Sequence, residues 1–399
     1  MSQVKRSKSA GRAGARRRQV ALIVETSVVY GRQILRGIAR YLRRHGGWSV
    51  FLDERELRAP PPDWLRRWKG DGVICRSTTP EWAEVFRQRG LPVVDLNDQH
   101  LELGLPRVAS DMVAIGRLGA RHLLERGFRQ LAYCGFLGET WSLQRRQGFT
   151  EVAGPALKRE WIFETRWLSV RERPYEEERQ RLACWLQTLP LPIGIMACND
   201  VRAQHVLDAC RQLGWSVPRQ VAVLGVDNAE TFCELCEPPL SSVVPDAERV
   251  GYEAAAMLDR LMAGAAAPAA PLLLPPRGVI TRQSTEVYAF AEPLVSRAME
   301  FIRQHACRGL RVEEVVRHLK CSRSWLESAF RRHVGHSPQR EIRAVQMQRA
   351  RELLLATDWK LPQIAQAVGV EQAAYLVCLF RKFYGLPPAR YRRQYGVAD

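Results

Sequence analysis

Several residues that could bind a polyol follow apolar runs of the kind that forms buried strands. Asn199 and Asp200 follow PIGIMAC, Asp227 follows VAVLGV, and Trp141 and Arg145 lie in TWSLQRR after QLAYCGF. A sugar needs paired acceptors and donors for its vicinal hydroxyls and an aromatic face for the apolar side of its ring. Acid, amide, guanidinium and indole groups together therefore predict a sugar-binding site.

A simpler role is open to any single acid in this set. An Asp that follows a strand often accepts a hydrogen bond from a backbone N–H in the first turn of the next helix. Asp111 and Asp200 both precede helix-like segments, so N-capping is the alternative for each of them. The prediction of a sugar site depends on the residues acting as a group.

Two similar segments near the C-terminus carry the second kind of chemistry. Leu326 and Phe330 in the first recur as Leu376 and Phe380 in the second, and basic residues, a Gly and a Pro follow each pair. Apolar residues three and four positions apart predict helices. The repeated plan of helix, tight turn and helix is the layout of a DNA-binding helix-turn-helix motif.

The two predicted turns differ in one residue. Gly369 can adopt the positive φ that such a turn requires, and the small side chain of Ala365 lets two helices approach each other. Lys320 occupies the corresponding glycine position of the first motif. A residue with a Cβ in the left-handed conformation costs about 1 to 2 kcal/mol, so the first turn can form but is strained.

The charge of the chain is segregated. The formal net charge is +18 and the pI is near 9.9. Residues 1–18 hold seven Lys and Arg and no acid, residues 293–399 hold nineteen against nine acids, and the middle of the chain is almost neutral. Two basic ends around a neutral centre favour a polyanionic partner, and nucleic acid is the natural one.

Composition also bears on location and cofactors. No apolar run is long enough to span a bilayer, so we expect no membrane association. Ten cysteines in a chain without a secretory signal are typical of reduced thiols in the cytoplasm. Cys233 and Cys236 have the spacing of a ligand pair, but no second Cys or His pair lies at a suitable distance, so we predict no metal and no cofactor.

The elements that must position these residues alternate from residue 19 onward. Short apolar runs and amphipathic stretches follow one another, which predicts parallel sheets with helices on both faces and ligands at the carboxyl ends of the strands. The Ala- and Pro-rich residues 263–278 are expected to form a surface connection. Near residues 285–293 the pattern becomes entirely helical, and Pro293 suits the first turn of a new helix.

Residues 293–395 resemble the DNA-binding domain of AraC/XylS-type regulators, in which a long helix joins two helix-turn-helix motifs. The matching positions are Ile364, Ala365, Gly369, Phe380, Arg381, Lys382, Gly385, Pro388 and Arg392. In the first recognition helix the resemblance implies base-edge contacts from Ser324, Glu327 and Ser328 and phosphate contacts from Arg323 and Arg331. In the second it places Ala373, Ala374, Val377 and Cys378 toward the groove, where they can pack on thymine methyls, and Arg381 and Lys382 toward phosphates.

Residues 19–285 resemble the sugar-sensing domain of LacI-type repressors, which is similar to two-lobed periplasmic sugar-binding proteins. The markers are RRQGF ending at Phe149, ND at 199–200, GVDN at 225–228, PPLSSV at 238–243 and TRQST at 281–285. The expected fold is an α/β two-lobed periplasmic-binding-protein-like sensor followed by an all-α domain with two helix-turn-helix motifs. The predicted boundaries are a disordered basic arm at 1–18, the sensor at 19–287 and the DNA-binding domain at 288–399.

Regulators that join these two modules resemble the chain beyond its basic arm, including YGRQ at 30–33, which adds Tyr30 to the ligand-binding set. The resemblance implies a cytoplasmic homodimer that binds double-stranded promoter DNA, responds to D-xylose by closing its lobes and activates sugar-catabolism genes with RNA polymerase. The segment GRLGARHLL after Asp111 is a candidate dimer interface.

Two alternatives stay open. Asn199 and Glu25 replace the Thr and Asn that those regulators carry, so the effector could be another pentose or a hexose, and a repressor released by sugar fits the same residues. An enzyme is the alternative from another class, because α/β sheets often host catalysis. The chain has no GxSxG elbow, P-loop or GxGxxG motif, so we expect a regulator and not an enzyme.

Overall fold

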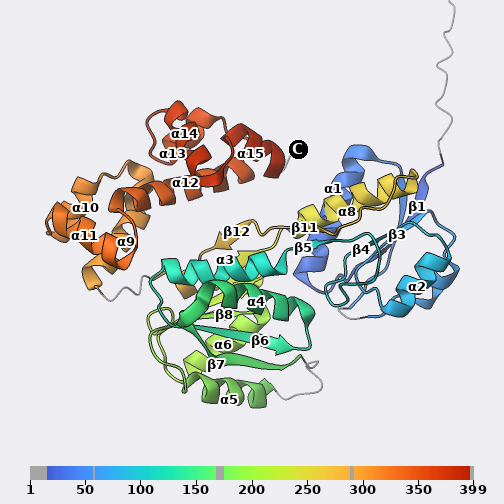
Figure 1. Cartoon of the computed structure of the whole chain (residues 1–399), viewed down its shortest axis with the longest axis horizontal. Coiled ribbons are helices and arrows are strands. Elements are labelled where there is room, and N and C mark those ends of the chain that lie inside the picture. The colour runs from blue at the N-terminus through green and yellow to red at the C-terminus, as the bar shows by residue number, and fades with distance from the viewer. Residues whose placement is uncertain (1–15, 57–58, 168–174, 288–291, 396–399) are drawn as a thin grey trace, which may run out of the picture. The chain divides into compact units, whose positions relative to one another are not determined.

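The computed structural model describes residues 16–56, 59–167, 175–287 and 292–395. It divides into two compact units that the chain enters more than once (Figure 1). The first unit comprises the chain up to Gly116 together with Phe136–Gly148 and Val243–Gly278. The second comprises Arg117–Gly135, Phe149–Ser242 and the chain from Val279 onward.

The first unit contains a four-stranded parallel sheet in the order β2-β1-β3-β4. The strands are β1 (Arg18–Ile23), β2 (Trp48–Leu52), β3 (Gly72–Cys75) and β4 (Val93–Asp95), and β5 (Val108–Ser110) pairs separately with β11 (Leu272–Leu274). The helices are α1 (Val29–His45), α2 (Pro80–Gln88) and α8 (Ala247–Met262), with a 3-10 turn η1 (Asp63–Arg67).

Alternation along β1 explains why helices cover both faces of this sheet. Val20 and Leu22 join the core under α1 and α8, whereas Ala21 and Ile23 join the core on the α2 side. The close approach of α1 and α8 requires glycine at position 37, because a Cβ there would lie 1.8 Å from a backbone oxygen of α8. A buried parallel sheet of this kind needs apolar residues on both faces, which is why its strands appear as continuous apolar runs.

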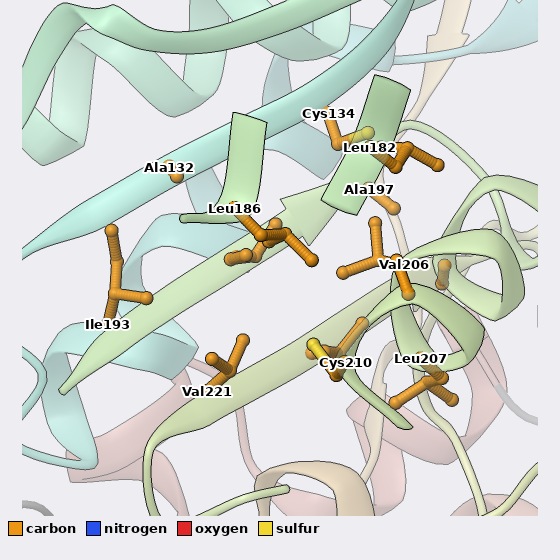
Figure 2. Packing of buried hydrophobic residues seen from close by; sticks show 14 of the residues in the cluster. Ala132, Cys134, Leu182, Leu186, Ile193, Ala197, Val206, Leu207, Cys210 and Val221 are labelled. Carbon is orange, nitrogen blue, oxygen red and sulfur yellow. The ribbon is translucent and has the colours of Figure 1, made fainter. Parts of the chain in front are cut away.

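A six-stranded sheet in the order β12-β10-β9-β8-β6-β7 is the centre of the α/β part of the second unit. Its strands are β6 (Leu131–Leu137), β7 (Leu157–Arg166), β8 (Ile193–Ala197), β9 (Val221–Val226), β10 (Ser241–Val244) and β12 (Gly278–Ile280). The accompanying helices are α5 (Tyr175–Leu186), α6 (Asp200–Gln212) and α7 (Glu230–Leu235), with 3-10 turns η2 (Gly154–Ala156) and η3 (Gln283–Thr285). Helices α3 (Met112–Glu125) and α4 (Thr140–Ala153) each have residues in both units. Figure 2 shows the core between β8, β9 and α6, where Ile193, Val206 and Val221 are fully buried.

The chain after Pro293 is entirely helical. Its elements are α9 (Pro293–His305), η4 (Ala306–Arg308), α10 (Val312–Leu319), α11 (Arg323–His333), α12 (Pro338–Ala356), α13 (Leu361–Ala367), α14 (Ala373–Tyr384) and α15 (Pro388–Tyr395). The long helix α12 runs from the bundle of α9–α11 to that of α13–α15 (Figure 1), and each bundle has its own core. Ser322 and Ser337 cap α11 and α12, and Pro293 opens α9 as predicted.

One expectation needs correction, and one cannot be compared with the structure. Arg18 belongs to β1 and pairs with Asp259 at 3.0 Å, so the basic arm ends before it. The Ala- and Pro-rich connection lies on the surface as predicted, since residues 263–271 are exposed, and it contains the short strand β11. Residues 1–15 and 288–291, which hold most of the arm and the predicted sensor boundary, lie outside the described residues.

Candidate functional site

A buried ion cluster lies at the carboxyl ends of three parallel strands of the first unit. Glu25 follows β1, Arg76 follows β3 and Asp98 follows β4. The Arg76 guanidinium donates to Glu25 Oε1 and, through Nη2, to Asp98 Oδ2 at 2.6 Å. The side chains of Arg76 and Glu25 are only 11% and 7% exposed. Burial alone lowers the pKa of Arg76, but Asp98 and Glu25 raise it above its ordinary value, so the guanidinium stays charged.

Tyr30, which the sequence predicted as a ligand contact, packs on this cluster. Its ring centroid lies 4.9 Å from the guanidinium carbon of Arg76, and its hydroxyl lies 2.8 Å from Ser110 Oγ. Burial raises the pKa of Tyr30, and the positive charge of Arg145 acts in the opposite direction. The fold of the first unit therefore places Tyr30 against the Arg76 cluster.

Trp141 and Arg145 lie one turn apart on α4. The guanidinium carbon of Arg145 is 5.0 Å from the centroid of the Trp141 ring. Arg145 is 3% exposed and Trp141 is 7% exposed. Trp141 Nε1 donates to Glu139 Oε2 at 3.0 Å, and Glu139 also accepts from the amide of Gln99. The guanidinium of Arg145 therefore packs over the indole ring of Trp141 within the buried part of the first unit.

The acids of the second unit lie where the sequence predicts, at the carboxyl ends of β8 and β9. These strands are parallel neighbours, so Asn199 and Asp200 after β8 lie at the same edge of the sheet as Asp227 after β9. The capping role falls to Asn199, whose side chain accepts from Arg202 N at 2.8 Å, and not to Asp200. Asp111 does cap its helix, accepting from Ala114 N at 2.8 Å.

Asp200 is a buried carboxylate with a fully defined environment. Ser242 Oγ donates to its Oδ1 at 2.6 Å and Ala229 N donates to its Oδ2 at 2.8 Å. A Cβ at Gly225 would lie 2.3 Å from Oδ1, so only glycine leaves room for the carboxylate there. Burial, and then repulsion from Asp227, raises the pKa of Asp200 to about 7. A carboxyl that titrates near neutrality in this position can donate or accept a hydrogen bond from a ligand hydroxyl.

The segment that carries Asp227 is strained and is held from several sides. Asp227 and Asn228 have φ values of 102° and 46°, which residues with a Cβ rarely adopt. Asn228 N donates to Ser242 Oγ at 3.0 Å, and Arg282 Nη1 donates to Asn228 Oδ1 at 3.0 Å. The GVDN, PPLSSV and TRQST motifs, far apart in the sequence, therefore meet at one place and fix the backbone beside Asp200.

The first helix-turn-helix motif consists of α10, a turn at Lys320 and α11. Lys320 has φ 55° and ψ 42°, which confirms the left-handed turn that the sequence predicts. Leu326 and Phe330 are fully buried, and Arg323, Ser324, Ser328 and Arg331 are exposed, as predicted for the face toward DNA. Glu327 is half-buried.

Arg323 is engaged within this motif. Its Nε donates to Glu327 Oε1 at 3.2 Å and its Nη1 donates to Glu313 Oε1 of α10 at 2.5 Å. Glu327 therefore already has a cationic neighbour, and a base contact from Glu327 would compete with Arg323. Sequence reasoning missed Glu313, because its contact with Arg323 depends on the angle between α10 and α11.

The second motif consists of α13, a turn at Gly369 and α14. Gly369 has φ +68°, and a Cβ there would lie 2.4 Å from Gly309 N, so packing as well as conformation demands glycine. The exposed positions of α14 include Ala374, Cys378, Arg381 and Lys382, while Ala373 and Val377 are half-exposed. Tyr375 is 45% exposed with the Arg343 guanidinium 5.2 Å from its ring, an aromatic contact that the sequence did not predict.

Three family models match separate parts of the chain. Residues 19–108 match the XylR N-terminal domain, residues 120–285 a periplasmic binding protein-like domain and residues 315–394 a helix-turn-helix domain. The xylose operon regulatory protein of Escherichia coli strain K12 is 33% identical, covering 94% of this chain and 97% of that protein. The chain belongs to the xylose operon regulatory protein family. Its member from Haemophilus influenzae is 30% identical over 94% of the chain.

Solved structures agree with this assignment of the chain to the xylose operon regulatory protein family. The structure of the xylose-binding transcription activator XylR covers 96% of this chain and 99% of its own, with a TM-score of 0.60 and 30% identity. The CelR–cellobiose complex covers 67% of this chain at 24% identity and a TM-score of 0.55, and it supports the sensor fold alone. The sequence predictions of a periplasmic-binding-protein-like sensor and a helix-turn-helix domain in a transcription regulator are confirmed.

Two further observations concern the described part of the chain. Within it, no helix has both the length and the apolar character needed to cross a membrane. Cys233 and Cys236 are buried in the core of the second unit, and burial raises the pKa of the Cys236 thiol to about 11. These cysteines therefore act as apolar core residues and stay protonated at neutral pH.

Proposed function

We propose that the chain is a D-xylose-responsive activator that binds promoter DNA as a homodimer and acts with RNA polymerase. The main support is that polar side chains gather at the carboxyl ends of the strands in each α/β unit of a chain that ends in two helix-turn-helix motifs. The xylose operon regulatory proteins, 33% and 30% identical to this chain, carry xylose in their names.

The proposed sugar contacts come from both clusters. Arg145 and Tyr30 in the first unit offer donors to hydroxyl oxygens, and the indole of Trp141 offers an apolar surface. In the second unit Asp200 and Asp227 offer acceptors to sugar hydroxyls. Asn199 uses its side-chain oxygen as a helix cap, which leaves its amide N–H groups as donors.

The charges of these clusters favour a neutral sugar over a sugar phosphate or a sugar acid. In the first unit two carboxylates, Glu25 and Asp98, already neutralise Arg76. In the second unit Asp200 and Asp227 are both acids, and burial, followed by the negative charge of Asp227, disfavours the charged form of Asp200 by raising its pKa. An anionic ligand would meet repulsion in both places, whereas a pentose or hexose would not.

For DNA we propose that α11 reads base edges through Ser324, Glu327 and Ser328, with Arg323 and Arg331 on phosphates. Helix α14 is proposed to pack Ala373, Ala374, Val377 and Cys378 on thymine methyls, with Arg381 and Lys382 on phosphates. The cytoplasm is the compartment in which such a regulator meets its promoter.

Titration calorimetry tests the sugar. We expect D-xylose to bind and xylose 5-phosphate to bind at least tenfold more weakly, because the phosphate adds charge to acidic clusters. The variant Arg145→Met should lose xylose affinity, whereas Arg159→Met, which changes an exposed residue of β7, should keep it. Equal affinity for D-xylose and other pentoses would support a broader effector, and retained affinity in Arg145→Met would remove that residue from the site.

Footprinting and transcription with purified RNA polymerase test the regulatory role. An activator should occupy its promoter and increase transcript in the presence of sugar, whereas a repressor released by sugar would show the reverse. Incubation of the protein with pentoses should give no turnover, and any conversion of the sugar would favour the enzyme alternative.

A further inference from the structure

Helix α1 presents a row of arginines on its outer face. The helix holds five arginines and no acid. Ile34 and Ile38 are buried in the core beneath it. Because an α-helix turns once in about 3.6 residues, Arg32, Arg36 and Arg43 project from the opposite side, and all three are exposed. The solvent face of α1 therefore carries positive charge along most of its length.

Contacts inside the chain do not account for this row. Arg32 Nη1 donates to the backbone oxygen of Thr26 at 2.8 Å. Arg36, Arg43 and the exposed Arg44 make no hydrogen bond or ion pair within the described residues. The partial negative charge at a helix C-terminus favours basic residues in the last turn, which explains Arg43 and Arg44. It does not explain Arg36, which lies in the middle of α1.

The acids of the neighbouring helix α8 do not neutralise the row either. Asp259 is occupied by Arg18 Nη1 at 3.0 Å and by the Tyr41 hydroxyl at 2.8 Å. Glu253 pairs with Arg249 of its own helix at 3.8 Å. Glu248 is the third acid of α8, and it stands against five arginines on α1.

The start of β1 extends the basic row beyond the end of α1. Arg18 N donates to Gly47 O at 2.9 Å, two residues after α1 ends at His45. Arg16 and Arg17, which precede the strand, are exposed. In the sequence they belong to residues 1–18, which hold seven Lys and Arg and no acid. We call the exposed set the α1 basic face; its members are Arg16, Arg17, Arg36, Arg43 and Arg44.

An extended row of exposed arginines is complementary to a polyanion with regularly spaced charges. From Arg32 to Arg43 the helix rises about 16 Å, at about 1.5 Å per residue. Over this length one strand of duplex DNA presents about five phosphates, one every 3.4 Å or so. The chain also ends in a helix-turn-helix domain, so duplex DNA is the polyanion to which its function already brings it.

The location of the α1 basic face keeps it apart from the polar cluster of the first unit. The face lies where β1 begins, whereas Glu25 and Arg76 follow the carboxyl ends of β1 and β3. Contact with DNA at one end of the sheet would leave the cluster at the other end uncovered.

We propose that the α1 basic face is a second DNA-contacting surface, which binds the phosphate backbone of duplex DNA. Contacts with phosphates carry no sequence information, so the face adds affinity and salt dependence while the helix-turn-helix motifs read the bases. The inference goes beyond the proposed function, and its failure would leave the proposed contacts of α11 and α14 standing.

The salt dependence of DNA binding tests the proposal on the full chain. Fluorescence anisotropy with a duplex of random sequence gives the slope of log affinity against log salt concentration. The variant Arg36→Gln/Arg43→Gln/Arg44→Gln should lower the magnitude of this slope by about 2 to 3, because each lost phosphate contact removes about 0.9. The variant with Lys at the same three positions should keep the wild-type slope. Melting temperatures should stay those of wild type, since all three side chains are exposed.

A matched control separates local contact from total charge. Arg159→Gln/Arg181→Gln/Arg219→Gln removes the same charge from exposed positions of the second unit and should leave the slope close to that of wild type. Equal slopes for the control and the α1 variant, whether both reduced or both unchanged, would overturn the proposal.

A crosslink tests the contact directly. Benzoylphenylalanine in place of Arg36 should crosslink to the duplex on irradiation, and the same group in place of Arg159 should not. Vesicles of phosphatidylcholine and phosphatidylserine test an anionic membrane as the partner. If the α1 variant lost binding to these vesicles while its DNA slope stayed that of wild type, the face would belong to a membrane and the proposal would be wrong.

Discussion

The buried carboxyl of Asp200 makes the stability of the chain depend on pH in a direction that can be worked out. Burial and Asp227 raise its pKa from 3.8 to about 7, while in the unfolded chain it keeps the ordinary value. Between these two values the folded state holds a proton that the unfolded state has released. The stabilising contribution of Asp200 is therefore complete below about pH 4 and is lost as the pH rises toward 7.

The size of this effect follows from the pKa shift of about three units. Each unit corresponds to about 1.4 kcal/mol, so the loss is at most about 4 kcal/mol between pH 4 and 7. The variant Asp200→Asn imitates the protonated side chain. Its amide can accept from Ala229 N and donate to Ser242 Oγ, two of the groups that contact Asp200 in the structure. We therefore expect the variant to be less sensitive to pH and more stable than wild type above pH 7.

Urea denaturation at pH 5, 6, 7 and 8 measures the difference in free energy of unfolding between wild type and Asp200→Asn. Subtracting the free energy of unfolding of the variant from that of wild type at each pH removes the contribution of other groups with raised pKa values, such as Asp95. Asp227→Asn is the matched control, because it removes the repulsion from Asp227 and should end the pH-sensitive range at a lower pH. A difference between wild type and Asp200→Asn that stays constant from pH 5 to 8 would refute the reasoning.

Three further predictions concern strain and ion pairing. Lys320→Gly should raise the free energy of unfolding by about 1 kcal/mol, since it relieves a left-handed residue with an exposed side chain, and Lys320→Ala should not. Gly369→Ala should cost more than about 2 kcal/mol, whereas Gly385→Ala, with open space at its Cβ, should cost only about 1, as measured by urea denaturation. Arg76→Met should cost about 3 to 5 kcal/mol by leaving two buried carboxylates without a cation, and adding Glu25→Gln and Asp98→Asn should recover most of this loss.

Elements with a strong hydrophobic period could be predicted from the sequence alone. The strands that carry Asp200 and Asp227 are continuous apolar runs, and the two recognition helices repeat the same pair of core residues. Turn chemistry was equally predictive, because Gly369 and Lys320 both adopt the left-handed conformation. In each case the deciding interaction is local, within a few residues of the pattern.

The parts that sequence reasoning missed are held by contacts between distant segments. Glu25, Arg76 and Asp98 meet only because β1, β3 and β4 are adjacent and in parallel register. Nothing near Arg76 in the sequence, CRST, distinguishes it from a surface arginine. Asn199 shows the same limit at short range, since neighbouring Asn and Asp are both good caps and the backbone conformation decides between them.

Helices α11 and α14 have similar core residues but differ in the side chains that we propose to face DNA. Each has two exposed basic residues in its last turn, Arg331 and Arg332 in α11 and Arg381 and Lys382 in α14, so both motifs should contribute similarly to salt dependence. Between those ends α11 offers hydroxyl and carboxylate groups, whereas α14 offers methyl and thiol groups. Hydrogen bonds to a base edge discriminate more strongly than contacts with a thymine methyl. A base change under α11 should therefore weaken binding by about 1 to 3 kcal/mol, and one under α14 by less, in a binding series with substituted operators at fixed salt.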